Sequence, residues 1–172
     1  MSAGGIFLYF NKKNSLSKTD IENKKVLDKM KSTQVAPSGL NPSDLTQVNK
    51  LIAQGKDKEA KAILDNLKAQ SGLQQYDKLD IYSSLSGVCT RLKDIDCMKE
   101  VIVFNKETDR VDVYLIIDTA RLLKSKDPDQ AKQYYAQAKN EIDSQGGRAY
   151  VEKQNNKSQV SIDYDEVSNG AL

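Results

Sequence analysis

Residues 43–67 read SDLTQVNKLIAQGKDKEAKAILDNL and contain two runs of apolar residues at helical spacing. In each run the apolar residues recur three or four positions apart, which places them on one face of a helix. Gln54-Gly55-Lys56-Asp57 separates the two runs, and such a glycine-containing segment favours a turn. Ser71-Gly72 ends the second run. The stretch therefore predicts two short helices joined by a tight turn.

The same pattern returns twice along the chain. Apolar periodicity predicts a second pair of helices over 79–92 and 95–104, and a third pair over 111–124 and 130–142. The turns between the paired helices fall at Lys93-Asp94 and at 125–128. The sequence thus predicts an all-α domain built from three helical hairpins.

Alignment of the hairpins places a small or adaptable residue at the start of each second helix. These residues are Ala60, Met98 and Ala131, which are 38 and 33 positions apart. One helical hairpin cannot bury its apolar face alone, whereas stacked hairpins bury a continuous core. The spacing therefore favours a repeat architecture.

Two segments carry a resemblance to a known family. GKDKEA, residues 55–60, resembles the turn and second-helix start of a tetratricopeptide repeat, and DPDQAKQYYAQA, residues 127–138, resembles its second helix. The resemblance implies a right-handed helical-hairpin solenoid of about three repeats over residues 41–145. It also implies a concave face that binds a protein or peptide partner.

The resemblance assigns the residues of a candidate partner groove. In the third hairpin the matching positions are apolar, and in the other two they are mixed. Either these apolar side chains bind a partner, or the chain's own tail or N-terminal helix covers them. The candidate groove residues are Asn49, Ile52, Val113, Ile116, Ala120 and Leu123, and the matching positions of the second hairpin are Asp80, Ser83, Gly87 and Thr90.

Composition excludes several classes of function. The chain has 172 residues, no histidine and two cysteines, so histidine-dependent catalysis and four-cysteine zinc binding are excluded. A formal net charge of +2 predicts no nucleic-acid binding. No catalytic, cofactor or metal motif is present, and we expect a non-enzymatic protein without a cofactor; an enzyme that uses carboxylate or lysine chemistry is a minor alternative.

The two cysteines, Cys89 and Cys97, lie on either side of the predicted turn at Lys93-Asp94. Because paired helices run antiparallel, the two thiols are expected at similar heights, close enough for a disulfide. The alternatives are two reduced, buried cysteines or a redox-active pair. A disulfide implies an extracytoplasmic location.

The regions outside the hairpins are polar apart from Ile6–Phe10. That apolar segment has three interpretations: a short element packed on the domain, the end of a membrane anchor N-terminal to Phe10, or a disordered tail. Lysines directly after it favour a cytoplasmic location, which conflicts with the disulfide. A basic helix is expected over 20–32, followed by a proline-containing linker that completes region 1–40.

The C-terminal region, residues 146–172, shows no helical period. We expect it to be a flexible polar tail, or to contain a strand-like segment over 160–164 where apolar and polar residues alternate.

These features together predict a protein–protein interaction scaffold, with the soluble region of a membrane-tethered envelope protein as one setting. The alternative is a structural or assembly subunit of a surface or secretion complex that acts through self-association.

Overall fold

The computed structural model describes residues 39–156 and 161–172, and these residues contain helices and no strand. The expectations for Ile6–Phe10, for a helix over 20–32 and for Val160 lie outside the described residues.

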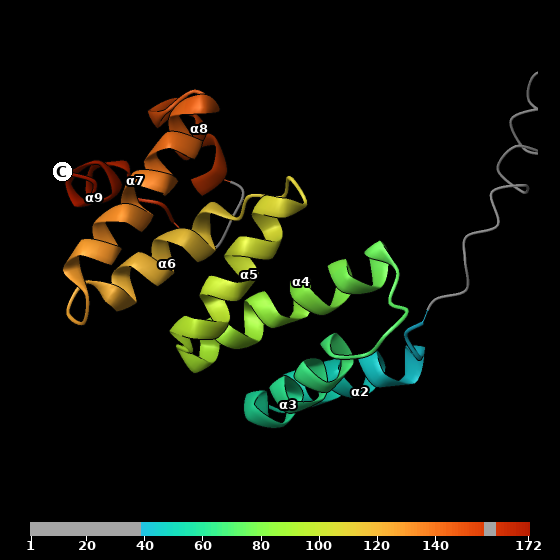
Figure 1. Ribbon diagram of the computed structural model, residues 1–172. Coiled ribbons are helices and arrows are strands. Elements are labelled where there is room, and N and C mark those ends of the chain that lie inside the picture. The colour runs from blue at the N-terminus through green and yellow to red at the C-terminus, as the bar shows by residue number, and fades with distance from the viewer. Residues whose placement is uncertain (1–38, 157–160) are drawn as a thin grey trace, which may run out of the picture. The chain divides into compact units, whose positions relative to one another are not determined.

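All six helices expected from the periodicity are present, and the all-α prediction is confirmed for the described part of the chain. Each of the six packs against the helix that follows it in the sequence (Figure 1). The helices are α2 (Pro42–Ala53), α3 (Asp57–Lys68), α4 (Gln75–Leu92), α5 (Ile95–Glu107), α6 (Val113–Leu123) and α7 (Pro128–Ser144).

Local sequence explains where these helices begin and turn. Asp94, Asp112 and Asp127 each precede a helix, and each carboxylate accepts a hydrogen bond from a first-turn backbone N–H. The residues that reverse the chain between α2 and α3 and between α4 and α5 are Gly55 and Lys93, with φ of +71° and +53°. Both turns therefore use the left-handed conformation that short helical connections need.

The positions aligned by sequence are buried in the structure. Ala60 and Met98 are fully buried, and Ala131 is 3% exposed. The positions four residues further along, occupied by Leu64, Ile102 and Tyr135, are buried as well. The second helix of each hairpin therefore turns the predicted face toward the core.

A buried carboxylate ties the segment before α2 to the start of α4. Asp77 is 1% exposed and accepts hydrogen bonds from the backbone N–H groups of Gly39 (3.1 Å) and Gln74 (2.9 Å). Gly39 lies so close to Gly72 that a Cβ atom there would be 2.9 Å from the Gly72 carbonyl oxygen. Asp77 thus both caps α4 and positions the chain at its entry to the hairpins.

The C-terminal region differs from expectation, because it forms two helices, α8 (Arg148–Asn155) and α9 (Tyr164–Gly170). The Asn155 side chain joins them by donating to the Ile162 carbonyl oxygen (2.8 Å) and accepting from the Ile162 N–H (2.7 Å). Both helices are short, and their few apolar residues do not produce a helical period that sequence analysis detects.

Contacts with α6 and α7 hold α9 in place. Glu166 accepts two hydrogen bonds from the Arg121 guanidinium, at 2.9 and 2.6 Å, and one from the Tyr135 hydroxyl at 2.8 Å. Val167 is fully buried, and a Cβ atom at Gly170 would lie only 2.5 Å from the Tyr135 ring. The C-terminal helix α9 is therefore docked by the buried Val167 side chain, by the close approach of Gly170 to the Tyr135 ring and by the hydrogen bonds of Glu166.

Acid should weaken this docking, because the Arg121 guanidinium lowers the pKa of Glu166 below its ordinary value of 4.5. A lowered native pKa stabilises the fold above the unfolded-state pKa and is lost as the pH falls through the native value. We expect Glu166→Gln to reduce the free energy of unfolding at pH 7 by about 1 kcal/mol. Urea unfolding between pH 7 and pH 3 measures this.

The variant should also lose the part of the acid dependence that Glu166 supplies, since glutamine does not titrate. Glu152→Gln on the exposed side of α8 is the matched control and should behave like the unaltered protein. An identical pH dependence in the Glu166→Gln variant would contradict the assignment.

Candidate interaction groove

A hollow of about 690 Å³ lies where the middle of α4, the α5–α6 connection with the start of α6, the end of α7 and the start of α8 meet. The described residues that line it are predominantly polar. They are Leu79, Ser83, Ser86, Gly87, Asn105, Asp109, Arg110, Val111, Asp112, Val113, Tyr114, Glu141, Gln145 and Tyr150. We call this hollow the polar groove.

One face of α4 forms a side of the polar groove. Leu79, Ser83, Ser86 and Gly87 are spaced four, three and one residues apart, which places them together on a helix. Three of the four are serine or glycine. Small side chains at these positions leave space that larger ones would fill.

Asp112 holds the beginning of α6 against α4. Its carboxylate accepts from the Leu115 backbone N–H at 3.1 Å and from the Ser86 hydroxyl at 3.4 Å. Two residues further, the Tyr114 hydroxyl oxygen is buried and has no hydrogen-bond partner among the described residues. A buried hydroxyl without a partner is unfavourable for the folded protein.

Tyr150 brings α8 to the same place. Burial raises the pKa of its hydroxyl, and the nearby Tyr114, Glu141 and Asp112 raise it further. Tyr150 therefore lines the polar groove together with Tyr114, Glu141 and Asp112.

The charge of the groove is negative. Its described lining has three carboxylates, from Asp109, Asp112 and Glu141, and one guanidinium, from Arg110. This follows the wider balance of the chain, because residues 39–172 contain 19 basic and 21 acidic side chains. The groove is suited to hydrogen-bonding and cationic groups rather than to phosphates.

The groove residues inferred from the family resemblance require correction. Val113 is at the edge of the polar groove but only 3% exposed, and Ile116, Ala120 and Leu123 are between 0 and 4% exposed. Asn49 is exposed and Ile52 half-buried on α2, away from this lining. The four α6 residues belong to the interior and do not form an open apolar surface.

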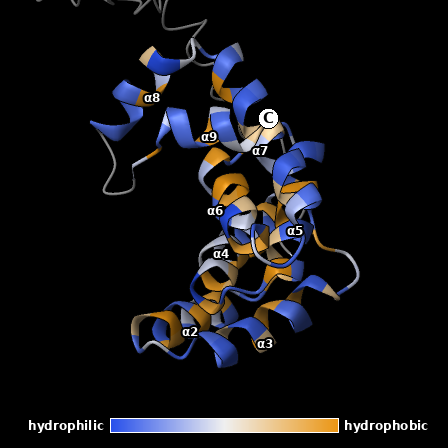
Figure 2. Cartoon of the chain, turned by 90° about the vertical axis from the view of Figure 1, so that its left-hand side faces the viewer, coloured by the Kyte–Doolittle hydropathy of each residue, from blue (hydrophilic) through white to orange (hydrophobic). Residues whose placement is uncertain are grey.

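The physical reason is the near-complete apolar circumference of α6, shown mostly in orange in Figure 2. Packing against α5 and α7 covers it, and α9 reaches its far end through Arg121. The apolar face of α6 is therefore covered by the neighbouring helices α5 and α7, and the C-terminal α9 packs mainly on α7. The helix expected over 20–32 lies outside the described residues.

Sequence reasoning missed the side chains that do face the groove. Tyr114, Asp112, Glu141 and Tyr150 were not candidates, whereas Ser83 and Gly87 occupied matching positions of the second hairpin. For one of them the sequence did hold a signal, namely a tyrosine that interrupts the apolar run of the α6 helix. Tyr114 is such a residue, next to Val113.

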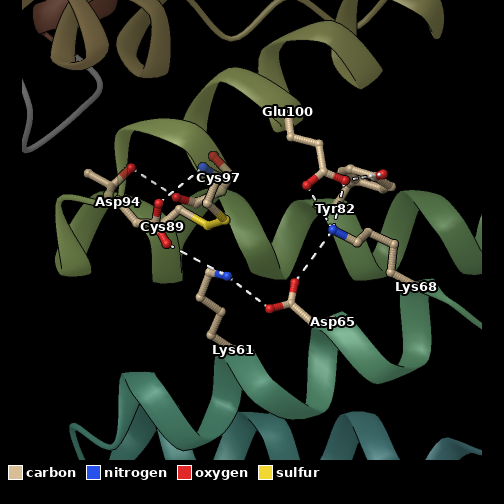
Figure 3. The surroundings of a disulfide bond; sticks show 10 residues. Lys61, Asp65, Lys68, Tyr82, Cys89, Asp94, Cys97 and Glu100 are labelled. Atoms are coloured by element: carbon tan, nitrogen blue, oxygen red, sulfur yellow. Dashed lines mark hydrogen bonds and ion pairs between the residues drawn. A yellow bond between two sulfur atoms is a disulfide. The ribbon is translucent and has the colours of Figure 1, made fainter. Parts of the chain in front are cut away.

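The two cysteines form a disulfide that joins the end of α4 to the start of α5, with Cα atoms 5.8 Å apart (Figure 3). Cys89 is fully buried and Cys97 is 6% exposed. Of the three interpretations of the cysteines, the structure has the disulfide. It closes one hairpin at its turn, beside Asp94, whose carboxylate caps α5.

Ion pairs beside the disulfide connect neighbouring hairpins (Figure 3). On α3, Lys61 pairs with Asp65 (2.8 Å) and reaches Asp94 (3.6 Å). Lys68 pairs with Glu100 on α5 (2.7 Å), which also accepts a hydrogen bond from the Tyr82 hydroxyl (2.9 Å). These ion pairs link α3 to the α4–α5 hairpin and so orient the two. Because the charged groups are partly exposed, the pairs add little stability.

No helix in the described part of the chain has the length and hydropathy required to cross a membrane. Among the same residues, no cluster of three or more acidic or cysteine side chains is placed to hold a metal ion.

We expect Ile116→Asp to unfold the domain, because it places an unpaired carboxylate where the native side chain is 1% exposed. The loss should be about 4 kcal/mol or more. Val103→Asp on α5, where the side chain is 57% exposed, is the matched control and should change stability by about 0.5 kcal/mol or less. Circular dichroism during urea unfolding compares the two variants. An Ile116→Asp protein as stable as the unaltered one would show that Ile116 is not interior and would support the apolar partner groove expected from the family resemblance.

Reduction should destabilise the protein by about 2–3 kcal/mol, as expected for a disulfide that closes a short loop. The measurement is urea unfolding with and without dithiothreitol. The double variant Cys89→Ala and Cys97→Ala should be insensitive to the reductant. If the reductant shifts the double variant as much as the unaltered protein, the effect does not come from this bond.

No protein-family model, curated protein or solved structure matches this chain.

Proposed function

We propose that this protein is a non-enzymatic interaction scaffold that binds a protein or peptide partner in the polar groove. The observation that carries the proposal is the groove itself, about 690 Å³ in volume and formed by side chains from two successive hairpins and α8. Consecutive hairpins that pack side by side are also the arrangement expected of a tetratricopeptide-like solenoid.

The lining favours binding over catalysis. It offers serine hydroxyls, an asparagine and a glutamine amide, and tyrosine rings. Such groups hydrogen-bond and pack against an extended chain, and aromatic residues are enriched where proteins meet. The charged groups are acids and a guanidinium without an activated nucleophile beside them.

The proposed location is extracytoplasmic. A buried disulfide between Cys89 and Cys97 supports it, because such bonds persist in oxidising compartments. A membrane tether N-terminal to Phe10 is part of this proposal and concerns residues outside the described part.

A photo-crosslinking amino acid placed at Ser83 tests the scaffold function in cells that make the protein. Ser83 is exposed in the groove, whereas Lys132 on α7 is exposed outside it and serves as the control. We expect a discrete crosslinked product from position 83 and none from position 132, with the partner identified by mass spectrometry.

Two other outcomes separate the alternatives. A product that contains a second copy of the chain, together with a concentration-dependent mass in light scattering, would favour the self-associating assembly subunit. Equal products from both positions, or none from either, would overturn the groove as the binding surface.

A further inference from the structure

We propose that the occupant of the polar groove is an extended, arginine-containing segment of a partner protein. This inference rests on the proposed scaffold function and adds the chemistry of the partner. Two observations carry it: the charge of the lining and the placement of Tyr150 beside its carboxylates.

Charge selects a basic occupant. Asp109, Asp112 and Glu141 outnumber Arg110 in the lining, so an acidic segment or a nucleic-acid phosphate meets net repulsion. Asp112 already caps α6 through one oxygen and receives the Ser86 hydroxyl on the other at 3.4 Å, a long contact that a cationic donor can replace. Glu141 is half-buried and has no ion pair to a described residue.

The tyrosines favour a guanidinium over an ammonium group. A planar guanidinium stacks on an aromatic ring and presents several donors at once, whereas lysine is a compact point charge. Tyr150 lines the groove together with Glu141 and Asp112, so one arginine side chain is able to stack on the ring and pair with a carboxylate.

The size of the groove selects an extended chain over a free small cation. The lining reaches from Leu79 on α4 to Tyr150 on α8, and its volume of about 690 Å³ exceeds what one arginine side chain fills. The serine and amide groups along it are suited to the peptide bonds of an extended backbone.

The test uses the full chain and fluorescently labelled Gly–Ser peptides that carry three arginines, three glutamines or three glutamates. We expect fluorescence anisotropy to detect binding of the arginine peptide, weakening with salt, and no binding of the other two. The double variant Asp109→Asn and Glu141→Gln should bind roughly three- to tenfold more weakly. Glu59→Gln with Asp129→Asn makes the same charge change outside the groove and should leave binding unaltered.

Tyr150→Leu separates the aromatic contact from the charge. Tyr150 is a half-buried tyrosine that lines the groove, and Tyr134 is a half-buried tyrosine of α7 outside it, so Tyr134→Leu is the matched control. Both variants should lose comparable stability in urea, and only Tyr150→Leu should weaken peptide binding, by about three- to tenfold.

The outcomes also distinguish this inference from the scaffold function. If the glutamine or glutamate peptide binds and the groove variants weaken it, the basic occupant is wrong and the scaffold function stands. If spermidine displaces the arginine peptide at equal concentration, the groove recognises a free cation and the extended-segment proposal fails. If no peptide binds and crosslinking from position 83 gives no product, both proposals fail.

Discussion

The removal of α6 from water is the constraint on which the rest of the described structure depends. Seven of its eleven residues are buried, and they surround most of the helix. A helix with this pattern is stable only when neighbours cover it on several sides. Here α5 and α7 supply the cover, while α9 packs on α7 with Val167 buried and reaches α6 through the Arg121–Glu166 ion pair. The C-terminal region is thus a part of the core assembly.

Because the apolar face of α6 is buried, the candidate binding surface lies at the polar beginning of that helix. The apolar stripe of that helix is occupied by the protein itself, and the side chains left facing the groove are those that interrupt the stripe or precede it, such as Asp112 and Tyr114. A polar groove of this kind relies on hydrogen bonds and charge for selectivity, because a hydrophobic surface discriminates weakly among partners. The acidic lining therefore carries more of the proposed specificity than the fold does.

A disulfide and a set of ion pairs constrain the first two hairpins. The disulfide closes the α4–α5 hairpin at its turn, and ion pairs from Lys61 and Lys68 orient α3 across it. The disulfide acts on the unfolded chain by restricting its conformations, whereas the ion pairs act on the folded one by selecting an orientation. The disulfide therefore constrains the α4–α5 hairpin itself, and the ion pairs orient the first hairpin on it.

The sequence by itself determined the six central helices and their turns, because periodicity and turn residues are local properties. It also placed Cys89 and Cys97 close enough for a disulfide but left two alternatives open, and the structure has the bond. The burial of Ala60, Met98 and Ala131 was likewise predictable from the sequence. Only the tertiary structure decided that α9 docks through Glu166 and Val167, since short helices with few apolar residues are stabilised by distant partners. It also decided that Ile116 is interior and Tyr114 faces the groove, because which side of an all-apolar helix remains open depends on the neighbours that cover it.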